Sequence, residues 1–236
     1  MTTLYLIRHG ETVNNVSGRY NGKQDDHPLN EAGLAQAERL SAAFAPIRLD
    51  AVYTSTLLRA RQTGEILRGE RAAVPLHRAD LDEYDFGILS SMRYADAEVI
   101  YPDLVRGLRQ EPMTTACPGG ESGADVVLRA TNALAEIVQA HRGNTVAVVT
   151  HGMLLQLIFA ELAGLPFHKR KELSIFNTAY AKLDIEDDGH FTVCCFNRHD
   201  HLSAEDLEKA TRKYTLYPET VANITVPTHF YAKFAK

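Results

Sequence analysis

Two histidine-glycine pairs, each at the end of an apolar stretch, are the residues of this chain best suited to do chemistry. One pair begins at His9 and directly follows Arg8, and the other is His151-Gly152. A further basic residue, Arg59, comes shortly after another apolar stretch. Arginine guanidinium groups bind phosphate oxygens in pairs and stay charged at any working pH. We therefore expect these side chains to converge on an anion.

This combination of residues predicts phosphoryl chemistry. A neutral histidine ring nitrogen beside arginines can attack phosphorus as a nucleophile. The other histidine can donate a hydrogen bond to the equatorial oxygens and so spread charge in the transition state. Helices predicted to begin after Thr12 and Gly152 would add backbone N–H donors. Such a reaction also needs an acid that protonates the leaving alcohol.

The segment LDEYDFG, residues 81–87, supplies three candidates for that acid: Asp82, Glu83 and Asp85. A carboxyl group that donates a proton near neutral pH needs a raised pKa, which burial or a nearby anion such as bound phosphate can produce. Position in the sequence does not choose among the three.

Apolar runs alternate with helical periodicity along the chain, and this alternation predicts where the candidate residues meet. The predicted strands cover residues 3–7, 50–55, 73–77 and 143–150. The predicted helices cover residues 28–45, with Asn30 as the N-cap, 56–69, a long stretch that begins after residue 122, and 153–165. Residues 178–197 alternate on both sides of Asp187-Asp188-Gly189, which predicts a hairpin.

The fold class expected from this order is α/β. We predict a three-layer sandwich in which a mostly parallel sheet with one antiparallel edge carries helices on both faces. Ligands of such sheets bind outside the carboxyl ends of the strands. The two histidine-glycine pairs occupy that position, so the sheet is expected to bring them together.

The 236 residues are expected to form a single domain. The stretch from about 81 to 118 lacks strong periodicity and contains three prolines, so we expect an irregular helical cap over the sheet. A C-terminal extension starts at about residue 197 and includes a helix-like stretch at 203–214. We expect the extension to pack along the domain, with a lid over the site as the alternative.

Composition excludes several classes of protein. A hydrophobic content of 45% and a charged content of 23% suit one globular core. The net charge of −5 and the lack of a dense basic run argue against a nucleic-acid partner. No signal-peptide pattern and no apolar stretch of about 18 residues is present, so no membrane partner is expected. Three cysteines without paired spacing favour a cytoplasmic protein.

Six motifs, taken in order, resemble the histidine phosphatase superfamily, which includes cofactor-dependent phosphoglycerate mutases and many broad-specificity phosphatases. The motifs are RHGET with Asn15, NGKQDDHPLNEAGLAQA, YTSTLLRARQT, LDEYDFG, PGGES and VVTHG. Each is a weak match alone, but six in this order over residues 3–185 form a strong signal. The resemblance implies a single phosphoglycerate mutase-like domain over residues 1–236.

The resemblance also implies roles. His9 would be the phosphorylated nucleophile, and Arg8, Arg59 and His151 would form the phosphate pocket with it. Glu83 matches the glutamate of the family's acid motif and would act first as the acid, then as the base for the incoming water. Further phosphate- or substrate-binding candidates are Asn15, Gly152, Thr12, Arg19, Gly22 and Asn177. The family mechanism implies no metal and no other cofactor.

A phosphatase and a mutase would both form phosphohistidine, and they differ in whether water or a retained sugar-acid phosphate takes the phosphoryl group. Bacterial mutases of the family typically carry Gly-Trp after the first arginine segment, whereas this chain has Lys23 there and no tryptophan. We therefore predict a phosphatase that acts on a small phosphorylated metabolite, with a mutase as the alternative. A non-catalytic phosphate sensor or scaffold is the second alternative, although the chain keeps both nucleophile and acid.

Two features fall outside the resemblance. After DFG many relatives continue with an aromatic residue or leucine and then Glu-Gly, whereas this chain has Ile88-Leu89-Ser90-Ser91, which changes a wall near the acid and leaves the substrate open. His199 and His201 flank an aspartate and would share a face if they lay in a strand, as a zinc site requires. We prefer a solvated loop there. Homodimer formation is also left open.

Overall fold

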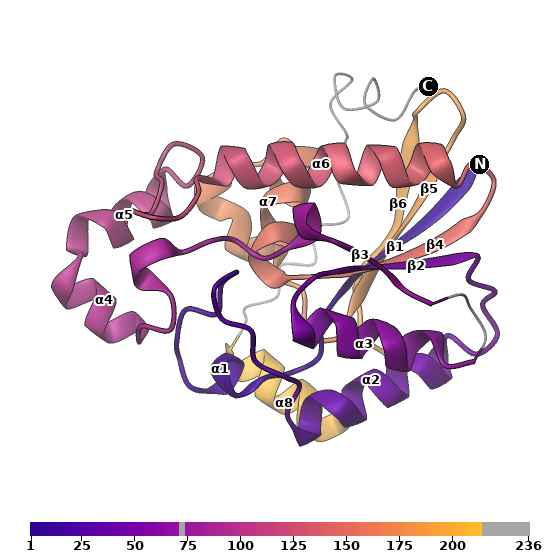
Figure 1. Ribbon diagram of the computed structural model, residues 1–236, viewed down its shortest axis with the longest axis horizontal. Coiled ribbons are helices and arrows are strands. Elements are labelled where there is room, and N and C mark those ends of the chain that lie inside the picture. Colours follow the sequence, from indigo (N-terminus) through magenta and orange to yellow (C-terminus); the bar gives the residue numbers. More distant parts are fainter. Residues whose placement is uncertain (71–73, 214–236) are drawn as a thin grey trace.

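A six-stranded sheet forms the centre of the described chain. The computed structural model describes residues 1–70 and 74–213, and its strands lie in the order β3-β2-β4-β1-β5-β6 (Figure 1). The strands are β1 (Thr2–Arg8), β2 (Ala51–Ser55), β3 (Leu76–Arg78), β4 (Thr145–Thr150), β5 (Tyr180–Ile185) and β6 (Phe191–Arg198). Strands β1 to β4 pair in parallel, and β5 and β6 pair antiparallel. The predicted antiparallel edge is therefore confirmed.

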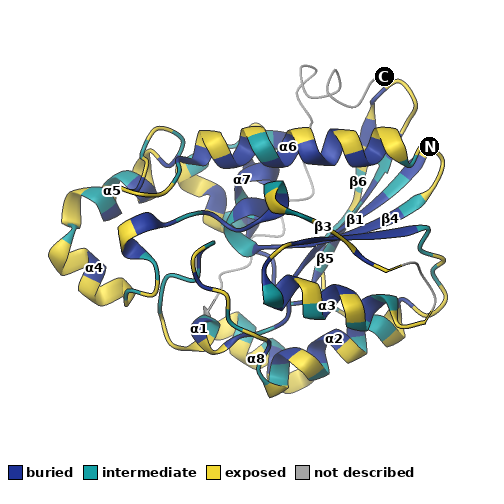
Figure 2. Ribbon diagram, viewed as in Figure 1, coloured by how far each residue is buried: buried dark blue, intermediate teal, exposed yellow. Residues whose placement is uncertain are grey.

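Helices cover both faces of this sheet, as predicted. The long helices are α2 (Glu31–Ala43), α3 (Leu58–Arg68), α6 (Gly123–Ala140) and α7 (Gly152–Leu162). Side chains of β1 alternate between two cores: Leu4 and Leu6 pack with α6 and α7, while Tyr5 and Ile7 pack with α2 and α3. Figure 2 shows the strands buried between the two helical layers. The three-layer α/β sandwich is confirmed.

Local sequence signals begin and end several of these elements. Asn30 caps α2, because its Oδ1 accepts a hydrogen bond from the Gly33 N–H at 2.8 Å. Ser122 and Asp125 form a capping box at the start of α6. Gly189 in the hairpin between β5 and β6 has φ 91°, a left-handed conformation that glycine adopts at little cost.

The cap region is more regular than the sequence predicts. It contains the short helices α1 (Val13–Val16), α4 (Tyr94–Ile100) and α5 (Pro102–Gln110), of which α4 and α5 lie within residues 81–118. Three 3-10 segments, η1 (Ala79–Leu81), η2 (Gly87–Leu89) and η3 (Phe167–Leu173), connect it to the sheet and to α7. Buried Arg170 of η3 donates to the Leu108 carbonyl of α5 at 2.7 Å. That bond fastens the cap to the body of the fold.

The described part of the C-terminal extension packs on α2. Helix α8 (Ala204–Lys213) places Asp206 against α2, where its carboxylate accepts from Gln36 Nε2 at 2.9 Å and pairs with Arg39. Leu202 packs with Phe176 in a small separate core. Packing is therefore confirmed for residues 197–213, and the remainder of the extension, residues 214–236, lies outside the described residues.

His199 and His201 do not lie in a strand, because β6 ends at Arg198. The loop interpretation is correct for the backbone, but it is wrong for the His201 ring, which is partly buried and bonds Thr178 Oγ1 at 3.1 Å. Across residues 1–70 and 74–213, no group of three or more potential ligands is arranged to hold a metal ion.

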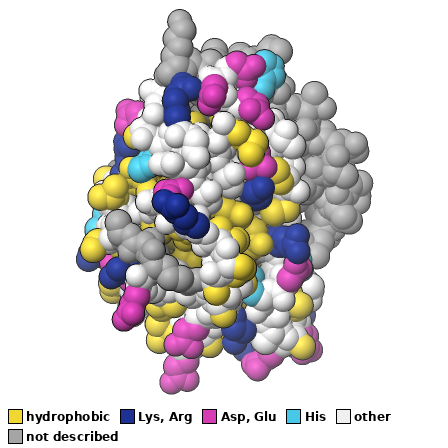
Figure 3. Space-filling model, turned by 90° about the vertical axis from the view of Figure 1, so that its right-hand side faces the viewer, with side chains coloured by type: hydrophobic (Ala, Val, Ile, Leu, Met, Phe, Trp, Pro, Cys, Tyr) yellow, Lys and Arg dark blue, Asp and Glu magenta, His cyan; other side chains and the backbone are white. Residues whose placement is uncertain are grey.

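On one face of the molecule, charged side chains are spread out rather than gathered in one patch (Figure 3). On the face shown in Figure 3, basic and acidic side chains alternate with apolar ones. Within the described chain, no helix combines the length and the apolar character that a membrane span needs.

Replacing His201 with glutamine is expected to reduce the protein's sensitivity to acid. Burial lowers the pKa of His201 to about 4, and the charge of Arg39 acts in the same direction. An unfolded chain binds a proton at this ring at roughly pH 6.5, so the stability that rests on the neutral ring is lost as the pH falls toward about 4. Between about pH 7 and 5 the free energy of unfolding should fall by about 1–2 kcal/mol less in the variant.

Urea denaturation at both pH values measures this difference. The same substitution at the exposed His168 is the control and should retain the wild-type pH dependence. Equal losses of stability in the wild type and in His201→Gln would contradict a buried, neutral His201.

Candidate active site

The carboxyl ends of β1, β4 and β2 bring the two histidines together. Strands β1 and β4 pair in parallel with Arg8 opposite Thr150, so the residues that follow them, His9 and His151, are neighbours. The His9 N–H donates to the Thr150 carbonyl at 3.0 Å, and the centroids of the two imidazole rings lie 5.1 Å apart. The predicted meeting of strand ends is confirmed.

The hydrogen bond of the His9 ring fixes its tautomer. Nδ1 of His9 lies 2.6 Å from the carbonyl oxygen of Gly10. A carbonyl oxygen can only accept, so Nδ1 carries the proton and Nε2 carries the lone pair. Gly10 itself is held close to α2, where an added Cβ would lie 2.6 Å from the Gly33 carbonyl oxygen. The main chain therefore favours the tautomer of the neutral His9 ring in which Nε2 carries the lone pair.

His151 is held as a neutral ring between two partners. Arg59 Nε donates to His151 Nδ1 at 3.2 Å, which places the proton of the ring on Nε2. That nitrogen lies 2.6 Å from the Ser55 hydroxyl, which also accepts from the Leu57 N–H. Burial lowers the pKa of His151 well below its ordinary value, and the charge of Arg59 acts in the same direction. His151 is therefore neutral at physiological pH.

Arg59 is fully buried and is bound by main-chain carbonyls. Its Nη1 donates to the Asp25 carbonyl at 2.5 Å and its Nη2 to the Gly22 carbonyl at 3.1 Å. Burial lowers the pKa of Arg59, and the nearby Glu83 carboxylate opposes that effect. Since the ordinary pKa of arginine is above about 12, the guanidinium stays charged. The loop of residues 20–25 thus positions a cation beside His151.

The loop that holds Arg59 is fastened to the segment after LDEYDFG. The buried Asp25 carboxylate accepts from the Gly22 N–H at 3.0 Å and from the Ser91 hydroxyl. Ser91 has φ 62°, in the left-handed region that favours glycine. Ser91 therefore holds a conformation that glycine adopts more easily, and its hydroxyl supplies a hydrogen bond that glycine could not supply.

Arg8 approaches the start of α7. Its Nη1 donates to the Ile175 carbonyl at 2.8 Å, and its guanidinium lies against Gly152, where an added Cβ would be 3.1 Å from Arg8 Nε. A side chain at position 152 would therefore displace Arg8. Arg8 and Gly152 are therefore neighbours in the structure.

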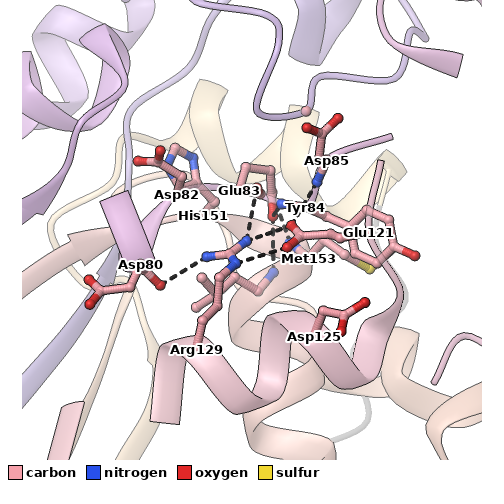
Figure 4. Close-up of polar contacts among 12 residues, drawn as sticks. Asp80, Asp82, Glu83, Tyr84, Asp85, Glu121, Asp125, Arg129, His151 and Met153 are labelled. Carbon is pink, nitrogen blue, oxygen red and sulfur yellow. Dashed lines mark hydrogen bonds and ion pairs between the residues drawn. The ribbon is translucent and has the colours of Figure 1, made fainter. Parts of the chain in front are cut away.

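Glu83 reaches the same end of α7 (Figure 4). Its Oε1 accepts from the Tyr84 N–H at 2.9 Å and the Leu154 N–H at 3.0 Å, and its Oε2 accepts from the Met153 N–H at 3.1 Å. These bonds place the carboxyl group beside the helix that begins directly after His151. Of the three acid candidates, Glu83 is thus the one bound at the start of α7.

The other two acid candidates are engaged elsewhere. The Asp82 carboxylate accepts from the Thr56 N–H and hydroxyl, both at 2.8 Å, at the end of β2. The Asp85 carboxylate accepts from Gln24 Nε2 at 2.8 Å. Both carboxylates therefore fasten loops, and the geometry selects Glu83 as the candidate acid.

The remaining predicted residues surround the main chain of this site. Asn177 Nδ2 donates to the His9 carbonyl at 2.9 Å and lies 3.4 Å from Asn15 Oδ1. Asn15 Oδ1 also accepts from the Thr12 N–H at 3.0 Å. Arg19 differs, because its Nη1 donates to the Ser91 carbonyl at 2.7 Å, outside this group. Roles in phosphate binding stay predictions for all four.

Several residues of the site are missing from the sequence-based set. Ser55 lies at a predicted strand end and Asp25 lies inside a motif, so both carried a positional signal. Arg129, by contrast, lies in none of the six motifs, and its guanidinium donates to the Glu83 carbonyl at 3.1 Å. The sequence offers no local sign of that contact.

Comparison with known proteins identifies the family. The family model described as histidine phosphatase superfamily, branch 1, matches residues 4–198. A metal-independent phosphoserine phosphatase of Arabidopsis thaliana is 34% identical over 169 residues, which is 69% of each chain. The probable phosphoglycerate mutase GpmB of Yersinia pestis is 29% identical over 79% of this chain and 86% of its own.

A solved structure shows the same fold. The structure of Bacillus stearothermophilus YhfR superposes with a TM-score of 0.80 at 34% identity, and the match covers 86% of this chain and all of that one. The fold and the order of motifs are therefore shared over most of the described chain.

Ser55→Ala is expected to lower kcat/KM about tenfold, the equivalent of one lost hydrogen bond. The substitution removes the oxygen that accepts from His151, so the buried ring loses one of its two anchors. Steady-state kinetics on any hydrolysed phosphomonoester measures the effect. Ser90→Ala is the control, since that buried hydroxyl has no hydrogen-bond partner among the described residues. Equal activity of the two variants would contradict a role for Ser55 in holding His151.

Proposed function

We propose, since the chain belongs to branch 1 of the histidine phosphatase superfamily, that it hydrolyses phosphomonoesters through a phosphohistidine on His9. The observation that carries this proposal is the bond from His9 Nδ1 to the Gly10 carbonyl, which leaves Nε2 as the nucleophile. The neutral His151 ring lies 5.1 Å from the His9 ring, centroid to centroid, and Arg59 donates to it. Phosphoserine phosphatase is the activity named for a relative, and that relative needs no metal.

The first half of the reaction transfers the phosphoryl group to the protein. His9 Nε2 forms a bond to phosphorus as the bond between phosphorus and the ester oxygen breaks. Glu83 gives its proton to the leaving oxygen, so the product is a neutral alcohol. The guanidinium groups of Arg8 and Arg59 stabilise the charge on the equatorial oxygens, which is the role a metal ion has in other phosphoryl-transfer enzymes.

The second half returns the protein to its starting state. The Glu83 carboxylate takes a proton from water, and the water oxygen attacks phosphorus as the bond to His9 Nε2 breaks. Inorganic phosphate leaves, Glu83 is again protonated and the His9 ring is again neutral. Throughout both steps, His9 Nδ1–H keeps its hydrogen bond to the Gly10 carbonyl. The tautomer of the ring is therefore preserved.

His151 acts beside this reaction in a way that its hydrogen bonds restrict. Its one N–H points at Ser55, so a phosphate oxygen would share that proton with the Ser55 hydroxyl. Its Nδ1 accepts from Arg59, which fixes the direction of the guanidinium. We assign to His151 both a donor role toward phosphate and the orientation of Arg59.

The proposed partner is a small phosphorylated metabolite, and no nucleic acid, membrane or metal is part of the proposal. The spacing of the three cysteines supports a cytoplasmic location. One domain with its cap and C-terminal extension, as a monomer or a homodimer, would carry the activity. A mutase remains the second candidate because a relative bears that name.

A phosphate-release screen over many phosphomonoesters, run on the wild type, His9→Ala and Glu83→Gln, tests the proposal. The His9 variant should lose hydrolysis to background, because the step through phosphohistidine is removed. The Glu83 variant should hydrolyse alkyl phosphates about 10²–10⁴-fold more slowly, the usual contribution of a general acid. Acid-labile phosphate on the protein after rapid quenching should be present in the wild type and absent in His9→Ala.

Other outcomes separate the alternatives. Rapid interconversion of 3- and 2-phosphoglycerate with negligible phosphate release would identify a mutase. Binding of phosphorylated ligands without hydrolysis of any of them would identify a non-catalytic sensor. Retained hydrolysis in His9→Ala would show that another group is the nucleophile.

A further inference from the structure

An ion pair behind the acid loop joins Arg129 of α6 to Glu121 (Figure 4). Arg129 Nη2 lies 2.7 Å from Glu121 Oε1, and Arg129 Nε lies 3.0 Å from Glu121 Oε2. The pair is bidentate, which is the strongest geometry for arginine and carboxylate. The side chains are only 18% and 16% exposed, so water screens the interaction little.

The same two side chains bind the main chain around Glu83 at three points. Arg129 Nη1 donates to the Asp80 carbonyl at 2.9 Å, and Nη2 donates to the Glu83 carbonyl at 3.1 Å. Glu121 Oε1 accepts from the Asp85 N–H at 2.9 Å. The pair thus fixes the main chain before Glu83, at Glu83 and after it.

The Glu83 side chain is held from the opposite direction. Its carboxyl group accepts from the N–H groups of Met153 and Leu154 in α7. The Arg129–Glu121 pair holds the main chain of Glu83, and α7 holds its carboxyl group. The position of the carboxyl group therefore depends on both sets of hydrogen bonds. A shift of about 1 Å at a reacting group can cost about 10²-fold in rate.

A structural purpose alone explains the pair poorly. Removing two charges from water costs several kcal/mol per ion in typical proteins, and apolar residues of similar volume are often as stabilising. The three contacts with residues 80–85 give the buried charges a purpose beyond stability, since all three converge on the segment that carries the acid.

We propose that Arg129 and Glu121 are positioning residues that hold the Glu83 carboxyl group at the leaving oxygen of the substrate. The proposal rests on the function proposed above, in which Glu83 is the general acid. It assigns no contact between Arg129 or Glu121 and the substrate.

The test compares two leaving groups in Arg129→Gln and Glu121→Gln. An alkyl phosphate such as glycerol phosphate leaves as a basic alkoxide and needs the acid, whereas p-nitrophenyl phosphate leaves as a stable phenolate and needs it little. The expected result is a loss of about 10–100-fold in kcat/KM on the alkyl ester and about threefold or less on the aryl ester. A general loss of structure would lower both rates alike.

Arg78→Gln is the matched control. Arg78 also pairs with a carboxylate of α6, Glu136, and with the Asp80 carboxylate, but its contacts do not include residues 83–85. That variant should keep the wild-type ratio of the two rates. Thermal unfolding of every variant is measured in parallel, and if Arg129→Gln does not fold, Glu121→Gln carries the test because it removes the negative charge that holds Arg129 in place.

Glu83→Gln distinguishes the two ways in which the proposal can fail. If Glu83→Gln itself lowers both rates equally, the assignment of Glu83 as the acid is wrong. A different result is that Glu83→Gln lowers kcat/KM on the alkyl ester more than on the aryl ester, while folded Glu121→Gln lowers both equally. In that case Glu83 remains the acid, but Arg129 and Glu121 do not position it. Discrimination by all three folded variants, with Arg78→Gln unchanged, supports the proposal.

Discussion

The burial of one positive charge organises this site. Arg59 has no exposed surface, and a buried guanidinium is costly unless its N–H groups are bonded. Its partners are two main-chain carbonyls and a ring nitrogen, none of which carries a full negative charge. The site therefore requires the loop of residues 20–25 to pack around Arg59 and accept its hydrogen bonds. The charge of Arg59 is therefore opposed at longer range, by the carboxylates of Glu83, Asp26 and Asp25.

The same charge determines the state of the second histidine. A protonated His151 would place two cations in contact in a buried space, and burial and Arg59 together keep the ring neutral. A neutral ring can accept from Arg59 at one nitrogen and donate at the other. Burial, charge and tautomer are thus one linked arrangement, in which the Ser55 hydroxyl provides the final acceptor.

Most of the fold could be predicted because its signals are local. The continuous apolar run of β1, the Asn30 cap of α2 and the turn at Gly189 depend on neighbours in sequence. The site was predicted where it follows from strand ends, since parallel strands must place Arg8 beside Thr150. The expected third strand began too early, at residue 73, because a short edge strand has few pairing residues to define it.

Long-range contacts explain what sequence reasoning could not supply. The bond between Glu83 and the Leu154 N–H joins residues 71 positions apart, so no local pattern separates Glu83 from Asp82 and Asp85. Arg129 reaches the Glu83 carbonyl from 46 positions away. In the sequence, only the family resemblance selects Glu83 among the three acidic residues, and nothing selects Arg129. Hydrogen bonds between a side chain and a distant part of the main chain leave no periodic pattern in the sequence, so they cannot be predicted from it.

The proposed nucleophile, His9, and the proposed acid, Glu83, are held by different elements. His9 extends from the end of a central strand, whereas Glu83 lies on a loop held by α6 and α7 and followed by the cap helices α4 and α5. Under the proposed function, substitutions in α4 and α5 would therefore alter the surroundings of Glu83 more directly than those of His9. If the proposed function holds, the strand end would keep the phosphate in place while the cap could change to admit a different alcohol.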